Sequence, residues 1–279
     1  MTQPDWIAAE CGPTQLRLWQ MAADDGVLDQ ASLPPVDAAG LAQAVASAWP
    51  DLPDATPVVV SGAGALPYPA VPCKPAGIAQ ATEQGRMRLL PGLAQEKPAD
   101  TLEHEATRVA GFLAINPGFD GVICLPGAQS RWVHVSAGEI VSFRSFLTGR
   151  LHALLADASL VGFDSNAPWD EAPGLEAVDQ AMGRPANFAG DLAAIAAEVR
   201  LRGLAAGPAS ARALGLLIGL ELAAAKPYWL GQSVALVADG AEAQPYRAAL
   251  EAQAVPVVVA DGIRMAREGL RAAYRDGAA

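Results

Sequence analysis

Residues 121–146 read GVICLPGAQSRWVHVSAGEIVSFRSF, and this stretch contains the pattern on which the fold prediction rests. Residues 121–125 form an apolar run that ends in a turn containing proline and glycine, as a buried strand and its connection would. Residues 131–135 and 140–146 then alternate between apolar and polar side chains, which is typical of half-buried strands. The stretch therefore predicts three consecutive strands joined by tight turns.

The same order of elements occurs near the N-terminus. Residues 6–9 are apolar, a Gly-Pro-Thr turn follows at 12–14, and residues 15–19 and 27–33 supply the second and third strands. Each triplet precedes a predicted helix and then an apolar strand. These are residues 36–49 and 57–60 in the first half, and 148–156 and 234–237 in the second. Because unrelated elements rarely fall in the same order, the repeat indicates a duplicated unit.

The remaining elements complete an α/β fold of two lobes, each a mixed sheet flanked by helices. Asp37 is the candidate cap of the helix at 36–49, and Asp100 is the candidate start of a helix at 101–114. Further helices are expected at 171–182, 188–202, 209–224, 242–253 and 263–274, and further strands at 86–90 and 256–259. We assign residues 1–116 to an N-terminal lobe and residues 117–279 to a C-terminal lobe. Ligands of such folds bind in a cleft near strand ends and helix N-termini.

Composition narrows the possible functions. A net charge of -11, from 30 acidic and 19 basic residues without a basic stripe, argues against a nucleic-acid partner. Three scattered cysteines predict reduced thiols and neither a disulfide framework nor a zinc site. The longest apolar stretch, 213–225, is too short for a membrane span and contains Glu221, so it predicts a core helix. The N-terminus lacks the basic segment of a signal peptide, so we expect a cytoplasmic protein without a membrane partner.

Gly12 and Gly127 occupy equivalent turns in the two repeats, and each has two interpretations. Tight glycine turns at strand ends can surround a phosphate with backbone N–H groups. Taken alone, however, such glycines more often simply close hairpins. Thr148 and Gly149, at a predicted helix start, can likewise bind an anion or form an ordinary cap.

Other polar residues are weighed in the same way. Glu105 can hold magnesium or a sugar, or can simply favour the start of its helix. Arg144 can pair with a carboxylate or phosphate, or can be a strand-surface arginine. His104 and His134 lack ligand partners at metal-binding spacing and receive no role. Cys11 lies beside the first turn, but no nearby His or Lys would activate its thiol, so a small buried residue is expected.

Several segments resemble the 2-dehydro-3-deoxygalactonokinase family. Residues 10–17 (ECGPTQLR) resemble its phosphate motif D-W-G-S-T-N-L-R, and residues 125–133 (LPGAQSRWV) resemble P-G-T-H-x-K-W-V. Residues 143–152 (FRSFLTGRLH) resemble F-R-T-x-M-T-G-E-L, and residues 215–221 match a helix near the family's C-terminus. The resemblance implies two RNase H-like lobes with the duplication of the actin, hexokinase and Hsp70 superfamily. It also implies transfer of a phosphoryl group from ATP, with Mg²⁺, to the terminal hydroxyl of 2-dehydro-3-deoxy-D-galactonate.

The resemblance also implies roles for particular residues. Glu10 would bind Mg²⁺, and Glu10 and Glu105 would be the catalytic carboxylates. Phosphate or nucleotide contacts are implied for Gly12, Thr14, Gly127, Gln129 and Gly240, and sugar-acid contacts for Arg144, Thr148 and Gly149. ATP and a small sugar acid would be the partners, and a homodimer is an open option.

The sequence departs from the family's motifs mainly at polar site positions. Glu10 replaces an Asp, and Pro13 replaces a Ser and so removes one backbone N–H from the turn. Ala128 and Gln129 replace Thr and His, and Arg150 replaces a Glu. Three segments also differ: residues 102–108 (LEHEATR, against M-R-G-E-E-T-Q), the shortened residues 61–67 (against G-M-x-G-S-x-x-G-W), and residues 239–241 (DGA, against G-T-S).

Two functions remain open on these grounds. The first is a kinase of a 2-keto-3-deoxy sugar acid. The second is a catalytically impaired family member that binds a sugar acid or nucleotide as a sensor or interaction protein, because losing transition-state donors costs on the order of 100-fold each in rate. A hydrolase is less favoured, since the chain has no G-x-S-x-G motif.

Overall fold

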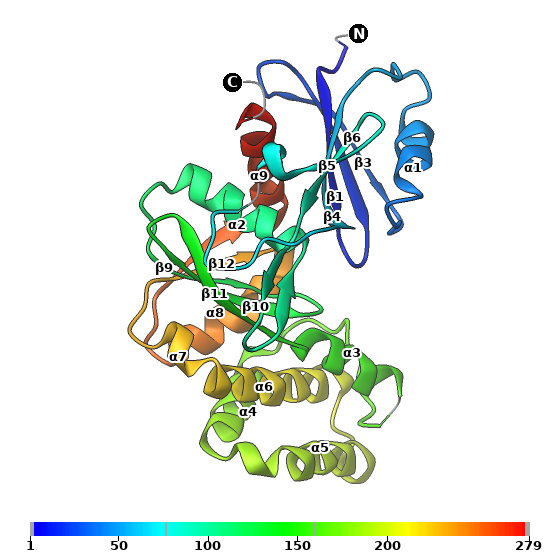
Figure 1. The fold of residues 1–279 in the computed structure, drawn as a ribbon. Helices are drawn as coiled ribbons and strands as arrows, with labels where there is room; N and C mark the ends of the chain where they lie inside the picture. The colour runs from blue at the N-terminus through cyan, green and yellow to red at the C-terminus, as the bar shows by residue number, and fades with distance from the viewer. Residues whose placement is uncertain (1–2, 76, 159, 277–279) are drawn as a thin grey trace. The chain divides into compact units, whose positions relative to one another are not determined.

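The computed structural model describes residues 3–75, 77–158 and 160–276. It is an α/β structure with two main sheets flanked by helices, as predicted (Figure 1). The chain divides into two compact units. Unit 1 comprises Met1–Asp120, Val135–Ser142 and Gly262–Ala279, and unit 2 comprises Gly121–His134 and Phe143–Asp261. The expected lobe boundary between residues 116 and 117 stays a prediction.

Unit 1 contains a mixed sheet of six strands in the order β3-β2-β1-β4-β6-β5. The strands are β1 (Trp6–Cys11), β2 (Leu16–Met21), β3 (Val27–Leu33), β4 (Val58–Ala65), β5 (Thr82–Gln84) and β6 (Met87–Pro91). Strand β1 runs antiparallel to β2 and parallel to β4, and β4 runs parallel to β6. A short antiparallel pair, β7 (Leu93–Gln95) and β8 (Asp100–Leu102), lies outside this sheet.

Alternation along β1 explains how helices come to cover both faces of this sheet. Ile7 and Ala9 pack in one core with α1 (Leu41–Ala48). Trp6 and Ala8 point to the opposite face and pack against α9 (Gly262–Asp276). All four side chains are buried, so β1 is a central strand with two apolar faces.

Helix α2 (His104–Ile115) packs closely on α9 within unit 1. A Cβ added at Gly111 would overlap the carbonyl oxygen of Met265, and one added at Gly269 would overlap the carbonyl oxygen of Thr107. The backbones of the two helices therefore approach closely, and a glycine on each helix makes this possible.

The five-stranded sheet has the order β11-β10-β9-β12-β13. Its strands are β9 (Gly121–Leu125), β10 (Ser130–Ser136), β11 (Glu139–Phe146), β12 (Val234–Ala238) and β13 (Val257–Asp261). In chain order this arrangement repeats β3-β2-β1-β4-β6 of the first sheet, and β12 is parallel to both β9 and β13. The duplication predicted from the sequence is therefore present in the sheet topology.

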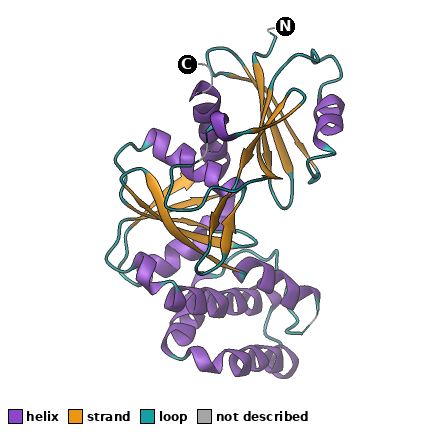
Figure 2. Cartoon of the chain, viewed as in Figure 1, coloured by secondary structure: helices purple, strands orange, loops and turns teal. Residues whose placement is uncertain are grey.

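Helices make up much of unit 2 (Figure 2). They are α3 (Thr148–Asp157), α4 (Glu171–Gly183), α5 (Phe188–Arg202), α6 (Ala206–Ala224), α7 (Lys226–Trp229) and α8 (Ala243–Ala252). Single 3₁₀ turns η1 (Ile78–Gln80), η2 (Pro185–Asn187) and η3 (Gly240–Glu242) complete the chain. Helix α6 packs with β9, β12 and α8 around Ile218 and Leu222, as expected for a core helix. Within the described residues, no helix has the length and apolarity to cross a membrane.

Two predicted helix starts are wrong. Asp100 does not begin α2, because residues 100–102 pair with β7 as strand β8 and the helix begins at His104. Asp37 does not cap α1 directly. Its carboxylate accepts a hydrogen bond of 2.9 Å from the N–H of Gly40, which closes a turn, and the helix begins at Leu41.

Candidate functional site

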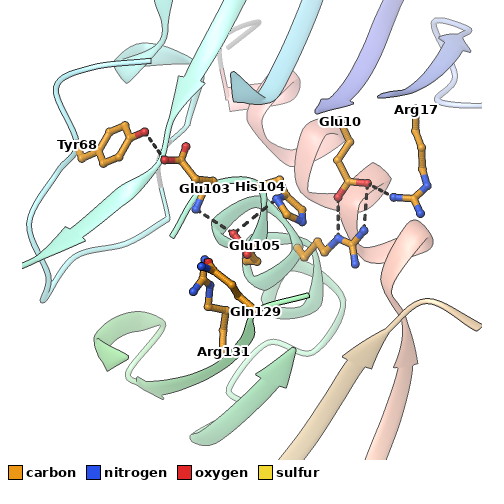
Figure 3. A network of polar contacts seen from close by, with 9 residues as sticks. Glu10, Arg17, Tyr68, Glu103, His104, Glu105, Gln129 and Arg131 are labelled. Atoms are coloured by element: carbon orange, nitrogen blue, oxygen red, sulfur yellow. Dashed lines mark hydrogen bonds and ion pairs between the residues drawn. The ribbon is translucent and has the colours of Figure 1, made fainter. Parts of the chain in front are cut away.

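Glu10 lies near the end of β1 and is completely buried, with 0% of its surface exposed. Arg17, its cross-strand partner on β2, donates from Nη1 to Oε2 at 2.8 Å. Arg108 on α2 donates from Nε to Oε1 at 2.7 Å and from Nη2 to Oε2 at 3.2 Å (Figure 3). Both carboxylate oxygens are therefore bound by guanidinium groups, so the buried charge of Glu10 is compensated.

The first turn joins β1 to β2 directly beside this carboxylate. The N–H of Gly12 donates to the carbonyl oxygen of Gln15 at 3.0 Å, so Gly12 does close the hairpin. Pro13 has no N–H to offer. Of the predicted motif Gly12-Pro13-Thr14, this leaves Thr14, which is exposed, to donate its backbone N–H to an anion. Phosphate binding by Gly12 and Thr14 stays a prediction.

Strand β4 carries Gly62 past the same end of β1. Ser61 is the register partner of Glu10, and Gly62 follows with a φ of 76°. A Cβ at Gly62 would overlap the carbonyl oxygen of Cys11 and would lie 2.9 Å from the Cβ of His104. The end of β1, the glycine-containing part of β4 and the start of α2 therefore converge, and glycine allows the close approach.

A second polar cluster lies at the start of α2, shown in Figure 3. The Tyr68 hydroxyl donates a short hydrogen bond to Oε1 of Glu103. Burial and the carboxylate of Glu103 both raise the pKa of Tyr68. The N–H of Glu103 donates to Oε2 of Glu105 at 2.9 Å, and Nδ1 of His104 lies 3.6 Å from the same oxygen. Glu105 thus stabilises the helix start, which was one of its two interpretations, and its catalytic role stays a prediction.

The second turn, in unit 2, is packed against the start of α3. A Cβ at Gly149 would overlap the carbonyl oxygen of Gly127 and lie 3.1 Å from the Cα of Ala128. The N–H of Arg150 donates to the carbonyl oxygen of Ala128 at 2.7 Å. The side-chain oxygen of Gln129 accepts a short hydrogen bond from Arg131. The structure therefore brings together Gly127 and Gly149, two residues to which the sequence assigned ligand contacts.

Thr148 is buried at the first position of α3, but its side chain does not cap the helix. Its hydroxyl donates a short hydrogen bond to Oε2 of Glu221 on α6. Tyr246 Oη donates to the same oxygen at 2.8 Å, and Trp132 Nε1 donates to Oε1 at 2.7 Å. Burial raises the pKa of Glu221, and these three hydrogen bonds act against that rise. The cap interpretation of the Thr148 side chain is therefore wrong, and contact with a sugar acid stays a prediction.

Arg144 and Gly240 lie on other elements of unit 2. Arg144 is exposed on β11, and its guanidinium carbon lies 5.8 Å from the centre of the Phe146 ring. Gly240 begins η3 shortly after β12 with a φ of 51°, and a Cβ there would meet nothing within 4 Å. The open space beside Gly240 is compatible with the predicted nucleotide contact, which stays a prediction along with the role of Arg144.

The sequence did not single out the partners of Glu10 and Thr148. Arg17 faces Glu10 across a predicted hairpin, so strand register was a usable signal. Arg108 is 98 residues from Glu10 and Glu221 is 73 residues from Thr148, so no local pattern joins either pair. Tyr68 directly follows the shortened segment 61–67, and no signal pointed to it.

The fold and the duplicated turns assign the chain to a structural class. Two mixed sheets of equivalent order, flanked by helices, form the actin- and hexokinase-like ATPase fold. A solved activator of 2-hydroxyisocaproyl-CoA dehydratase from Clostridium difficile, with bound ADPNP, has the same fold at a TM-score of 0.54 and 12% identity. That match covers 98% of this chain and 96% of the other.

The model of the 2-keto-3-deoxy-galactonokinase family matches residues 10–273, and the chain belongs to this family. A 2-dehydro-3-deoxygalactonokinase of Escherichia coli (strain K12) is 28% identical, covering 95% of this chain and 96% of the relative. A probable 2-dehydro-3-deoxygalactonokinase, DgoK1, of Rhizobium meliloti (strain 1021) is 29% identical, covering 97% and 96%. A solved candidate 2-dehydro-3-deoxygalactonokinase from Sinorhizobium meliloti has a TM-score of 0.86 and 28% identity, covering 97% and 96%.

Proposed function

We propose that this chain is an ATP-dependent kinase that phosphorylates a 2-keto-3-deoxy sugar acid such as 2-dehydro-3-deoxy-D-galactonate. The observation that carries the proposal is the family match over residues 10–273, which includes both glycine turns at equivalent places in the duplicated sheets. Phosphoryl transfer depends mainly on positioning and charge stabilisation, and tight turns at strand ends provide both through backbone N–H groups.

The proposal assigns a task to each group of site residues. Thr14 and the rest of its turn, Gly127 with Gln129, and Gly240 would hold the phosphates and nucleotide of ATP. Arg144 and the Thr148-Gly149 pair would contact the sugar acid, and Glu105 would orient the hydroxyl that accepts the phosphoryl group. ATP and the substrate are both anions, so arginines near the turns offset the repulsion of a chain with net charge -11. A cytoplasmic location belongs to the proposal as well.

Magnesium, which the resemblance implies at Glu10, does not fit the arrangement described here. Both oxygens of Glu10 accept from arginines and the residue has no exposed surface, whereas Mg²⁺ binds open carboxylates and keeps several waters. Among the described residues, no group of three His, Cys, Asp or Glu could hold a metal. We therefore propose that Glu10 stabilises Arg17 and Arg108 and does not bind Mg²⁺.

Calorimetric titration with ATP and Mg²⁺, followed by a coupled kinase assay over a panel of 2-keto-3-deoxy acids, tests the proposal. We expect saturable nucleotide binding and turnover with at least one acid. An absence of nucleotide binding at millimolar concentration contradicts the proposal. Binding without turnover would support the sensor function instead.

A turn variant links activity to the site. Gly149→Ala would place a Cβ against the carbonyl oxygen of Gly127 and so force α3 and the turn apart, and misplaced phosphate contacts cost on the order of 100-fold in rate. Gly190→Ala on α5 is the matched control, because a Cβ there meets nothing within 4 Å. Equal activity of the two variants would exclude the second turn from the reaction.

A further inference from the structure

Glu221 is a buried carboxylate that joins four elements of unit 2. It lies on α6 and is 1% exposed. Trp132 on β10, Thr148 on α3 and Tyr246 on α8 all donate hydrogen bonds to it. A buried carboxylate is costly, and apolar side chains of similar volume would hold the same helices together without that cost. What hydrogen bonds add is a defined geometry for the groups that donate them.

One of these hydrogen bonds leads directly to the second turn. Thr148 precedes Gly149 and Arg150, whose backbones touch the turn at Gly127 and Ala128. Helix α3 has no side-chain cap at Leu147, so the Thr148 bond to Glu221 is the side-chain anchor at this helix start. The position of the turn against α3 thus depends on a residue 73 positions along the chain from Thr148.

We infer that Glu221 is a positioning residue, which through Thr148 holds the first turn of α3 against the second glycine turn and so keeps that turn in shape for a phosphate of ATP. The inference rests on the proposed function. Tyr246 bonds the same oxygen from α8 and not from α3, the helix whose backbone touches the turn, so we expect it to contribute to stability and not to the phosphate contacts.

Steady-state kinetics of three variants separate positioning from stability. Glu221→Gln and Thr148→Val should raise the KM for ATP about tenfold to a hundredfold, the usual effect of removing a partner that orients a ligand-binding group. Thr148→Ser keeps the hydroxyl and should restore a KM close to that of the wild type. Tyr246→Phe should lower the Tm while the KM for ATP stays unchanged.

Hydrogen exchange without nucleotide provides a second readout. Glu221→Gln and Thr148→Val should speed exchange in residues 126–131 and 147–151, whereas Tyr246→Phe should speed exchange in α8. The inference is overturned if Thr148→Val and Tyr246→Phe raise the KM equally, or if neither Glu221→Gln nor Thr148→Val changes exchange in the turn. If the wild type itself fails to bind ATP, the proposed function is wrong and the inference falls with it.

Discussion

The Cys11 thiol lies where burial and the neighbouring Glu10 carboxylate both disfavour its ionised form. Burial is the larger cause, and together they raise the pKa of Cys11 to about 12. At pH 8 only on the order of one thiol in ten thousand would then be ionised, and the thiolate is the nucleophile. We expect iodoacetamide to label Cys11 slowly in the folded protein and rapidly after unfolding in guanidinium, as measured by peptide mass spectrometry. Rapid labelling of the folded chain would contradict the expected environment.

The buried ion pairs of Glu10 predict how much this single residue contributes to stability. Replacing it with Ala leaves Arg17 and Arg108 buried without the carboxylate that accepts from both. Removing one partner of a buried ion pair typically costs about 3–5 kcal/mol. Urea unfolding should show that loss for Glu10→Ala and almost none for Glu83→Gln, an exposed site on β5. A change below about 1 kcal/mol, the size typical of exposed pairs, would mean that the buried pairs contribute little.

Helices α3 and α6 are joined at His152, and this contact predicts a pH dependence. Its ring stacks on Phe163, and Nε2 lies 3.2 Å from the carbonyl oxygen of Ser210. Burial lowers the pKa of His152 below its ordinary value of 6.5, so near pH 6 the unfolded chain binds more protons than the folded one. The free energy of unfolding should therefore fall as pH drops from 6.5 through the lowered pKa.

A His152→Gln variant isolates this effect. The variant cannot take up the proton, so its unfolding free energy should depend less on pH between 6.5 and 5 than that of the wild type. Urea unfolding at several pH values gives the comparison. Parallel profiles for the two proteins would show that His152 is not the source of the dependence.

The crossing of α4 and α6 depends on glycine. A Cβ at Gly219 would overlap the carbonyl oxygen of Val178 and lie 2.8 Å from the Cβ of Ala181. Gly219→Ala should therefore destabilise the protein by about 1–3 kcal/mol through overpacking. Gly207→Ala, in the same helix with nothing within 4 Å, should be neutral or stabilise by up to about 1 kcal/mol. Equal Tm values for the two variants in calorimetry would refute the close approach.

The sequence pattern predicted the strands and helices better than it predicted which side chains bind one another. The sequence pattern located β1 as an apolar run, β2 by its alternation of apolar and polar residues, and β3 as the strand that follows a turn. The strands β7 and β8 are three residues each and show no period, which is why Asp100 was assigned to a helix start. The motifs pointed to Glu10 and Thr148, but the arginines and the glutamate that bind them come from distant elements that only the fold brings near.

At the scale of the whole molecule, the two ends of the chain share one core. Trp6 on β1 stacks on Tyr274 of α9 with ring centres 4.4 Å apart, and Tyr274 donates to Asp5 at 2.8 Å. Ending the chain at Asp261 removes α9 and exposes the apolar face of β1 and β4. We expect this shortened chain to bind a hydrophobic dye and to lose near-UV circular dichroism. A soluble product with native spectra would show that α9 is dispensable.

This arrangement has a consequence for how the protein is made. Chains emerge from the ribosome N-terminus first, and domains generally fold as units during synthesis. Strand β1 precedes every other described element in the chain, and α9, the helix that covers one of its faces, follows all of them. The nascent chain therefore carries this apolar face of β1 without its covering helix until residues 262–276 have been made. Unit 1 begins before unit 2 in the chain, but it is completed only after the last residues of unit 2 have been made.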